Sequence, residues 1–187
     1  LSTGALFLVV GMLYERRHTR MIADFGGLTK QMPVFATFFM IVTLSSIGLP
    51  GLNGFVGEFL ILVGTFKSRI LYASIATSGI ILAAVYMLWM FQRVMFHEIT
   101  HEENKTLQDI NKREFAILIP IILLIFWIGI YPNSFLRKMD ASVNHLLKQV
   151  GEKANIVSTL QKQNEFEQLQ QNVTPKIDIV PEAKTEW

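Results

Sequence analysis

A long apolar stretch interrupted by proline and glycine constrains this chain more than any other feature. No charged residue lies between Lys30 and Glu58, yet residues 48–54 in its middle read GLPGLNG. Pro50 has no backbone N–H to donate, and its ring clashes with the carbonyl four residues earlier, so a continuous helix is excluded there. The sequence therefore predicts two half-helices joined by a break.

Each residue of the break has an expected role. Gly48, Gly51 and Gly54 allow the backbone to bend and to pack closely, and Pro50 ends the first half-helix. Asn53 is expected to cap a second half-helix that starts at the last of these glycines. Irregular backbone at membrane depth occurs where it is buried in protein or lines a cavity, and transporters use such breaks to line ion paths. The break therefore indicates an ion-conducting segment.

A single acidic residue, Glu58, follows the break closely. A charged side chain at the centre of a bilayer costs about 2.5 to 3.5 kcal/mol on insertion scales, so such residues are usually functional. Burial increases the affinity of a carboxylate for protons, whereas a nearby cation or helix N-terminus decreases it. We predict that Glu58 is a proton carrier. The alternative is a structural carboxylate that is paired inside the bundle and holds the break.

Several hydroxyl groups lie near the break. Thr65 shares the helical face of Glu58 and is a candidate supporting residue through a bound water, although a hydrogen bond back to its own helix is favoured. Thr43, Ser45 and Ser46 either face a hydrated file or satisfy carbonyls that the break frees. The second interpretation is favoured for these three residues.

The apolar residues occur in blocks that are too long for soluble helices. Of 187 residues, 51% are hydrophobic, which predicts an all-α integral membrane bundle with one discontinuous helix. The first block is too short to span a bilayer, so the chain is expected to be a C-terminal fragment that begins inside a helix. The expected organisation is a membrane domain at 1–132, with spans at about 1–14, 34–66 (broken at 48–54), 70–92 and 115–131, then an amphipathic helix at 133–150 and a mostly disordered tail at 151–187.

Composition excludes several other functions. The net charge of +2 does not favour a nucleic-acid partner. Because the chain has no cysteine, it forms neither disulfides nor thiolate-ligated metal or iron–sulfur sites, and no cofactor is expected on this chain.

The distribution of Lys and Arg indicates an orientation in the membrane. A modest excess places the loops around Arg17 and Asn104 in the cytoplasm or matrix, with the C-terminal helix on the other side. Glu15, Arg16 and Arg17 are expected to pair locally or to contact a neighbouring subunit. Surface pairs of this kind are usually weak.

Four sequence motifs resemble one family. The motifs are YERRHTR at 14–20, GLPGLNGFVGEF at 48–59, REF at 113–115 and GIYP at 129–132. They are similar to the last four helices of the antiporter-like subunits of respiratory complex I, over roughly residues 1–148. Within that group the NuoM type (chain M of NADH:quinone oxidoreductase) is most similar, because it carries a glutamate at the position of Glu58. Sister subunits and Mrp antiporters typically carry lysine there.

The resemblance implies a membrane subunit of a proton-pumping NADH:quinone oxidoreductase in the respiratory chain. Such a subunit contributes to proton translocation that is driven by quinone reduction elsewhere in the complex. Implied partners are the other membrane subunits, the lipid bilayer and protons. The implied location is the inner (plasma) membrane of a bacterium or the mitochondrial inner membrane. Alternatives are an Mrp-type cation/proton antiporter, a membrane-bound hydrogenase subunit, or a scaffold that only holds its neighbours.

One motif points to a different chemistry. Residues 97–101 read HEITH, and on a helix His97 and His101 would share a face and bind zinc with Glu98 as general base. Glu103 and Glu114 are only weak candidates for a third ligand. Because the motif follows the end of a span and enters a charged loop, a chance match is favoured over a membrane zinc protease.

Overall fold

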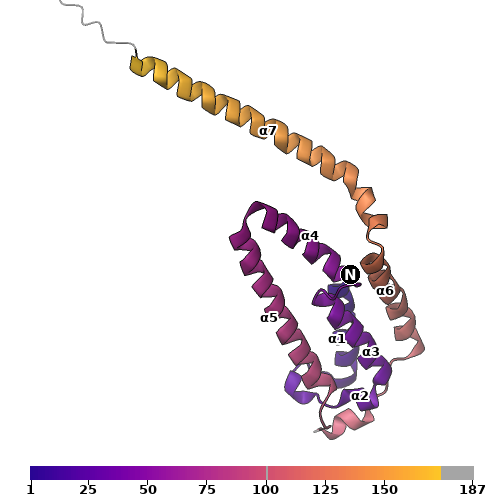
Figure 1. Cartoon of the computed structure of the whole chain (residues 1–187). Helices are drawn as coiled ribbons and strands as arrows, with labels where there is room; N and C mark the ends of the chain where they lie inside the picture. The colour runs from indigo at the N-terminus through magenta and orange to yellow at the C-terminus, as the bar shows by residue number, and fades with distance from the viewer. Residues whose placement is uncertain (100, 174–187) are drawn as a thin grey trace, which may run out of the picture. The chain divides into compact units, whose positions relative to one another are not determined.

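The regular secondary structure of the described residues is all helical, as the apolar blocks predict. The structure is a computed structural model that describes residues 1–99 and 101–173, and the described residues contain no β-strand. They form two compact units, Leu1–Leu136 and a second unit that begins at Arg137. The elements in chain order (Figure 1) are α1 (Ser2–Arg17), η1 (Ile22–Asp24), α2 (Leu28–Gln31), α3 (Pro33–Ser46), α4 (Asn53–Ser68), α5 (Ile70–Met95), η2 (Glu102–Thr106), α6 (Lys112–Ile130) and α7 (Asn133–Val173).

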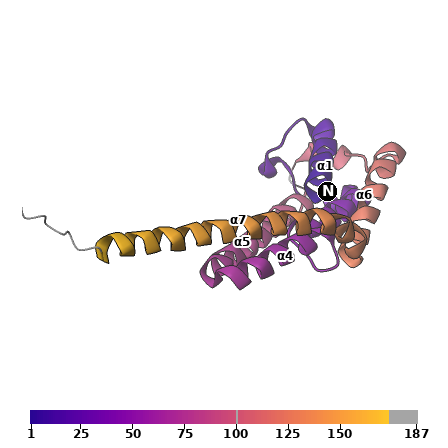
Figure 2. The same ribbon diagram turned by 90° about the horizontal axis from the view of Figure 1, so that it is seen from above.

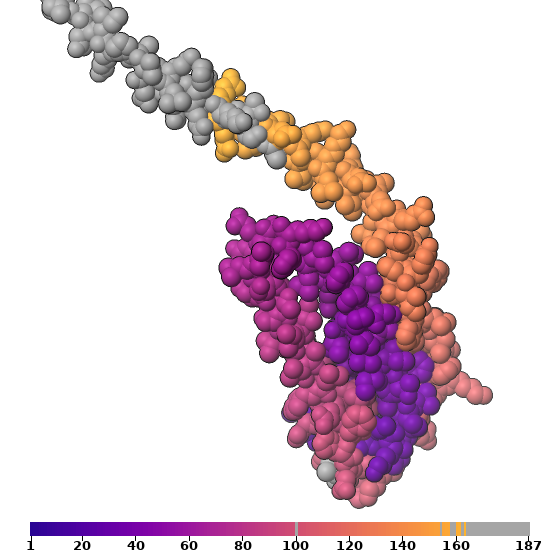
Figure 3. Space-filling model, in the orientation of Figure 1, coloured from indigo at the N-terminus to yellow at the C-terminus, as the bar shows by residue number. Residues whose placement is uncertain are grey.

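The core of the first unit lies around α3. This helix packs against α1, α5 and α6, while α4 packs mainly against α5 and α6. Phe35 on α3 is fully buried, together with Val9 of α1 and Leu118 of α6. Figures 1 and 2 show that α4 and α5 are consecutive helices joined by a tight turn. The side chains of this helix pair form one outer edge of the unit (Figure 3).

Two described helices are long and apolar enough to cross a membrane. These are α5, with 26 residues, and α6, with 19. Helices α3 and α4 have 14 and 16 residues and are each shorter than a typical span. Large apolar side chains are exposed along α4 and α5, including Ile61 (69%) and Leu71 (71%). An exposed apolar edge of this extent fits contact with lipid or with another protein surface rather than with water.

The predicted break is confirmed, and it lies between Ser46 and Asn53. Two of its glycines have left-handed backbone angles, with φ of 76° at Gly48 and 91° at Gly51. Glycine adopts this conformation without the steric penalty that other residues pay. Pro50 lies between them in the turn that connects the half-helices.

The expected boundary at residue 150 is wrong. A single helix, α7, continues from Asn133 to Val173, so residues 151–173 are helical rather than disordered. Gly151 lies inside this helix, where a glycine costs about 1 kcal/mol relative to alanine but does not stop the helix. The Gln, Glu and Lys residues that follow are strong helix formers. The rest of the expected tail, 174–187, lies outside the described residues. The placement of 133–150 on a membrane interface stays a prediction.

Candidate functional site

The carboxylate of Glu58 lies against the break. Glu58 is half-buried on α4, and a Cβ added to Gly48 would collide with its Oε2 and lie 3.0 Å from its Cδ. Gly48 is therefore required for two reasons: its φ is positive, and its missing side chain makes room for the carboxylate. Glu58 and the helix break are close in the sequence, and in the structure they also lie against each other.

The backbone of the break packs closely against neighbouring backbone at two glycines, Gly54 of α4 and Gly129 of α6. A Cβ on Gly54 would collide with the carbonyl oxygen of Ser45, so the first turn of α4 lies tightly against the end of α3. A Cβ on Gly129 of α6 would collide with the carbonyl oxygen of Gly51 and lie 2.5 Å from the Cα of Leu52. The break is thus covered by α6. In the sequence Gly129 is only one residue of the GIYP motif, because its contact with the break depends on the fold.

Three neutral polar side chains join α1, α3 and α4 at the break. The Ser2 hydroxyl lies 2.7 Å from that of Ser45 and donates to Asn53 Oδ1 at 2.8 Å. The Ser45 hydroxyl donates to the same Oδ1 at 2.7 Å. We call this group the Ser–Ser–Asn cluster. It corrects the expected role of Asn53, because the N-cap of α4 is Leu52 and the Asn53 side chain faces the two serines instead.

The other hydroxyls near the break have different surroundings. Thr65 donates to the carbonyl of Ile61 at 2.8 Å, so its hydroxyl is held by its own helix and the supporting role is not favoured. Ser46 likewise donates to Val42 at 2.9 Å. Thr43 is fully buried, and its hydroxyl has no hydrogen-bond partner among the described residues.

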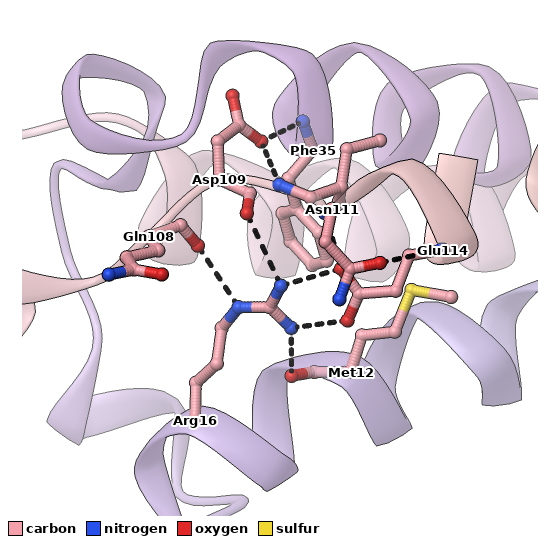
Figure 4. Close-up of polar contacts among 8 residues, drawn as sticks. Met12, Arg16, Phe35, Gln108, Asp109, Asn111 and Glu114 are labelled. Atoms are coloured by element: carbon pink, nitrogen blue, oxygen red, sulfur yellow. Dashed lines mark hydrogen bonds and ion pairs between the residues drawn. The ribbon is translucent and has the colours of Figure 1, made fainter.

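A charged cluster lies at the opposite end of α3 (Figure 4). The Arg16 guanidinium donates to both carboxylate oxygens of Glu114, at 2.8 and 2.7 Å, and their side chains are 16% and 9% exposed. It also donates to the backbone carbonyls of Met12 (2.9 Å), Gln108 (3.0 Å) and Asp109 (3.4 Å). Two parallel bonds between a guanidinium and a carboxylate are stronger and more directional than a single contact. We call these contacts the Arg16 cluster.

The Arg16 cluster lies where three helix ends meet. These are the last turn of α1, which carries Arg16, and the first turns of α3 and α6. Asp109 accepts hydrogen bonds from the backbone N–H groups of Val34 (2.8 Å) and Phe35 (2.9 Å) at the start of α3. Glu114 and Asn111 form a reciprocal capping box at the start of α6. The hydrogen bond to the Glu114 carboxylate raises the pKa of Arg16, so the guanidinium stays charged. The expectation of weak local pairing at Arg16 is wrong, because its partners come from the loop and helix about a hundred residues later.

Arg17 also binds the loop between α5 and α6, through Glu103 and Asn104. It donates to the side-chain oxygen of Asn104 at 2.8 Å and forms an ion pair with Glu103. Asn104 is fully buried and donates to the carbonyl of Asp24 at 3.0 Å. The loops around Arg17 and Asn104, predicted to lie on one side of the membrane, therefore do meet at one end of the unit.

The described residues of the HEITH motif, 97–99 and 101, do not form the helix that the zinc interpretation requires. Helix α5 ends at Met95, and His97 has φ of 80°, so the two imidazoles do not share a helical face. The ring of His97 lies 3.3 Å from the carbonyl of Gln92, and that of His101 lies 3.3 Å from the carbonyl of Ala23. Among residues 1–99 and 101–173, no three His, Asp or Glu side chains are arranged to hold a metal ion.

Comparisons with known proteins show what the chain is similar to. Residues 1–82 match the family described as NADH:quinone oxidoreductase/Mrp antiporter, transmembrane. NADH-quinone oxidoreductase subunit M of Rickettsia prowazekii is 52% identical over 145 residues, which make up 78% of this chain and 30% of that protein. The chain is therefore similar to subunit M over most of its own length but to less than a third of that protein. NADH-ubiquinone oxidoreductase chain 4 of Marchantia polymorpha is 44% identical over 148 residues, or 79% of this chain and 30% of that protein.

A solved structure carries the same fold. One chain of respiratory complex I from Thermus thermophilus with bound NADH matches 73% of this chain and 28% of its own length, with 35% identity and a TM-score of 0.68. The chain thus spans about 30% of the length of the subunit M relatives that it matches. The relatives are subunits of an enzyme complex, and the resemblance inferred from the sequence motifs is confirmed.

Proposed function

We propose that this chain forms part of the proton-translocating membrane domain of an NADH:quinone oxidoreductase, with Glu58 as the proton carrier. The observation that carries the proposal is the contact between the Glu58 carboxylate and Gly48 in the helix break. The names of the subunit M relatives and of the complex I structure support the assignment to this enzyme. Other membrane subunits and lipid would surround the chain in a bacterial plasma membrane or a mitochondrial inner membrane.

The chemistry proposed for this chain is proton transfer alone. A carboxylate at a helix break has access to backbone groups that no regular helix satisfies, and such groups can order water next to it. Glu58 would accept a proton from one side and release it to the other when its surroundings change. The driving energy would come from quinone reduction elsewhere in the complex. No bond other than O–H is made or broken at this site.

The test is NADH-driven proton uptake by inner-membrane vesicles that contain the full-length protein with Glu58→Gln. We expect assembly of the complex to be retained while protons taken up per electron transferred fall, because the amide cannot carry a proton. Glu98→Gln is a matched control, since Glu98 is exposed in the loop after α5. Wild-type uptake per electron in the Glu58→Gln complex would contradict the proposal. Loss of assembly without loss of uptake in the complex that remains would favour a scaffold.

A cation/proton antiporter is the second candidate, because the matching family description also names Mrp antiporters. The two functions differ in what drives proton movement. Uptake that depends on sodium and continues without NADH oxidation would favour the antiporter. Uptake that requires NADH and is independent of sodium would favour the oxidoreductase.

A further inference from the structure

The Ser–Ser–Asn cluster closes the loop in which Gly48 lies. Ser45 and Asn53 stand on either side of the break, and their hydrogen bond of 2.7 Å joins the end of α3 to the start of α4. Ser2 adds the start of α1 as a third attachment, through contacts of 2.7 and 2.8 Å. Residues 46–52, including the glycine that contacts Glu58, are therefore held between two linked ends.

The two serines of the cluster are buried and Asn53 is half-buried, so bulk water has limited access to their hydrogen bonds. Ser45 is fully buried and Ser2 is 8% exposed. Hydrogen bonds in such surroundings are electrostatically stronger than in water, and an unpaired group there is costly. We therefore expect the loss of one contact in the cluster to alter the conformation of the break.

The cluster is also electrically neutral. Serine hydroxyls and the asparagine amide do not titrate at physiological pH, so they do not compete with Glu58 for protons. A lysine or aspartate in the same place would hold the break but would also shift the proton affinity of a carboxylate near it. Neutral hydrogen bonds fix the geometry and leave Glu58 as the titratable group at the break.

We propose that Ser2, Ser45 and Asn53 are positioning residues that set the conformation of the break against which Glu58 exchanges its proton. This inference rests on the proposed function of Glu58 and goes beyond it. The cluster would act through Gly48, whose backbone position determines the space that the carboxylate occupies. The cluster itself carries no proton across the membrane.

Adjacent serines on α3 provide the test. Ser45→Ala removes a cluster hydroxyl, whereas Ser46→Ala removes a hydroxyl that bonds only to Val42 of its own helix. In vesicles with the assembled full complex, we expect Ser45→Ala and Asn53→Ala to lower protons per electron by up to about fivefold, since one hydrogen bond contributes about 1 kcal/mol. The pH dependence of uptake should also move. Ser46→Ala should match wild type, and Ser45→Thr, which keeps the hydroxyl, should restore uptake.

The outcomes separate this inference from the function on which it rests. If Glu58→Gln lowers uptake but Ser45→Ala and Asn53→Ala keep the wild-type ratio and pH profile, the positioning role is overturned and the carrier role stands. If Glu58→Gln has no effect, both fall. Ser2→Ala, which removes only the α1 member, is an independent variant. Failure of assembly in all three alanine variants would overturn the inference, because the cluster would then hold the fold and not tune the site.

Discussion

The two ends of α3 are held by opposite kinds of chemistry. Its first turn is capped by the Asp109 carboxylate, beside the ion pair of Arg16 and Glu114. Its last turn is tied by the neutral Ser–Ser–Asn cluster, through Ser45 and Asn53. Charges are used where the loops meet, and uncharged groups are used next to the half-buried Glu58. The protein thus keeps additional titratable groups out of the cluster that holds the break.

The two ends of α3 also differ in the strength of the hydrogen bonds that hold them. Hydrogen bonds between charged groups are roughly twice as strong as those between neutral groups. Loss of a contact at the charged end of α3 is therefore expected to cost more free energy of unfolding than loss of a contact at the neutral end.

The largest expected effect comes from Arg16→Ala at the charged end. Removing the guanidinium leaves the mostly buried Glu114 carboxylate without its partner, and breaking such a pair destabilises a protein by about 3 kcal/mol. The assembled complex should be less abundant and unfold at a lower temperature. Arg113→Ala is the control, because Arg113 is exposed one residue from Glu114. Equal thermal stability of the two variants would refute the anchoring role.

A smaller effect is expected where α6 covers the break. In Gly129→Ala the new methyl group meets the backbone at Gly51, which cannot rotate away, and overpacking of this kind costs about 2 kcal/mol. Gly79→Ala on α5 is the control, since a Cβ there meets nothing within 4 Å. Thermal unfolding of the detergent-solubilised complex compares them. The contact is unimportant if Gly129→Ala is as stable as Gly79→Ala.

The cap at the start of α3 should contribute less. Asp109→Ala removes the acceptor for the N–H groups of Val34 and Phe35, and loss of such a cap costs about 1 kcal/mol. Asp109→Asn keeps one acceptor oxygen and should lose only part of this stability. The same unfolding measurement ranks the variants, and an alanine variant no less stable than the asparagine variant would contradict the capping role.

The smallest effect is expected at Thr43, near the neutral end. Its buried hydroxyl has no partner among the described residues, so Thr43→Val should be neutral or stabilise the protein by up to about 1 kcal/mol. Protons per electron should stay at the wild-type value. A clear loss of uptake in a stable Thr43→Val complex would show that this hydroxyl binds water or a proton, and the polar site would then have to be extended beyond the Ser–Ser–Asn cluster.

The break could be predicted because its signals are local. Pro50 and the glycines around it exclude a regular helix whatever they contact. The role of Asn53 could not be predicted in the same way, because its partner Ser2 is separated from it by 51 residues. Helix capping by Asn53 is predicted from local sequence alone. In the structure the Asn53 side chain instead accepts a hydrogen bond from the Ser2 hydroxyl of α1.

The charged cluster and the C-terminal helix show the same limit. Arg16 and Glu114 are 98 residues apart, and the sequence offers only neighbouring charges as partners for each. The weak periodicity beyond Gly151 predicts disorder, but the residues there favour helix and α7 continues to Val173. The helix that the zinc interpretation of residues 97–101 requires does not form there, since α5 ends before the first histidine of the motif.

Infrared difference spectroscopy of the purified complex during turnover tests the central claim most directly, because it detects the C=O stretch of a protonated carboxyl group. The account predicts a carboxyl band that appears and disappears with turnover in wild type and is missing in Glu58→Gln. The band should persist but change its pH dependence in Ser45→Ala. Identical carboxyl bands in wild type and Glu58→Gln would show that Glu58 does not change protonation and would contradict the account.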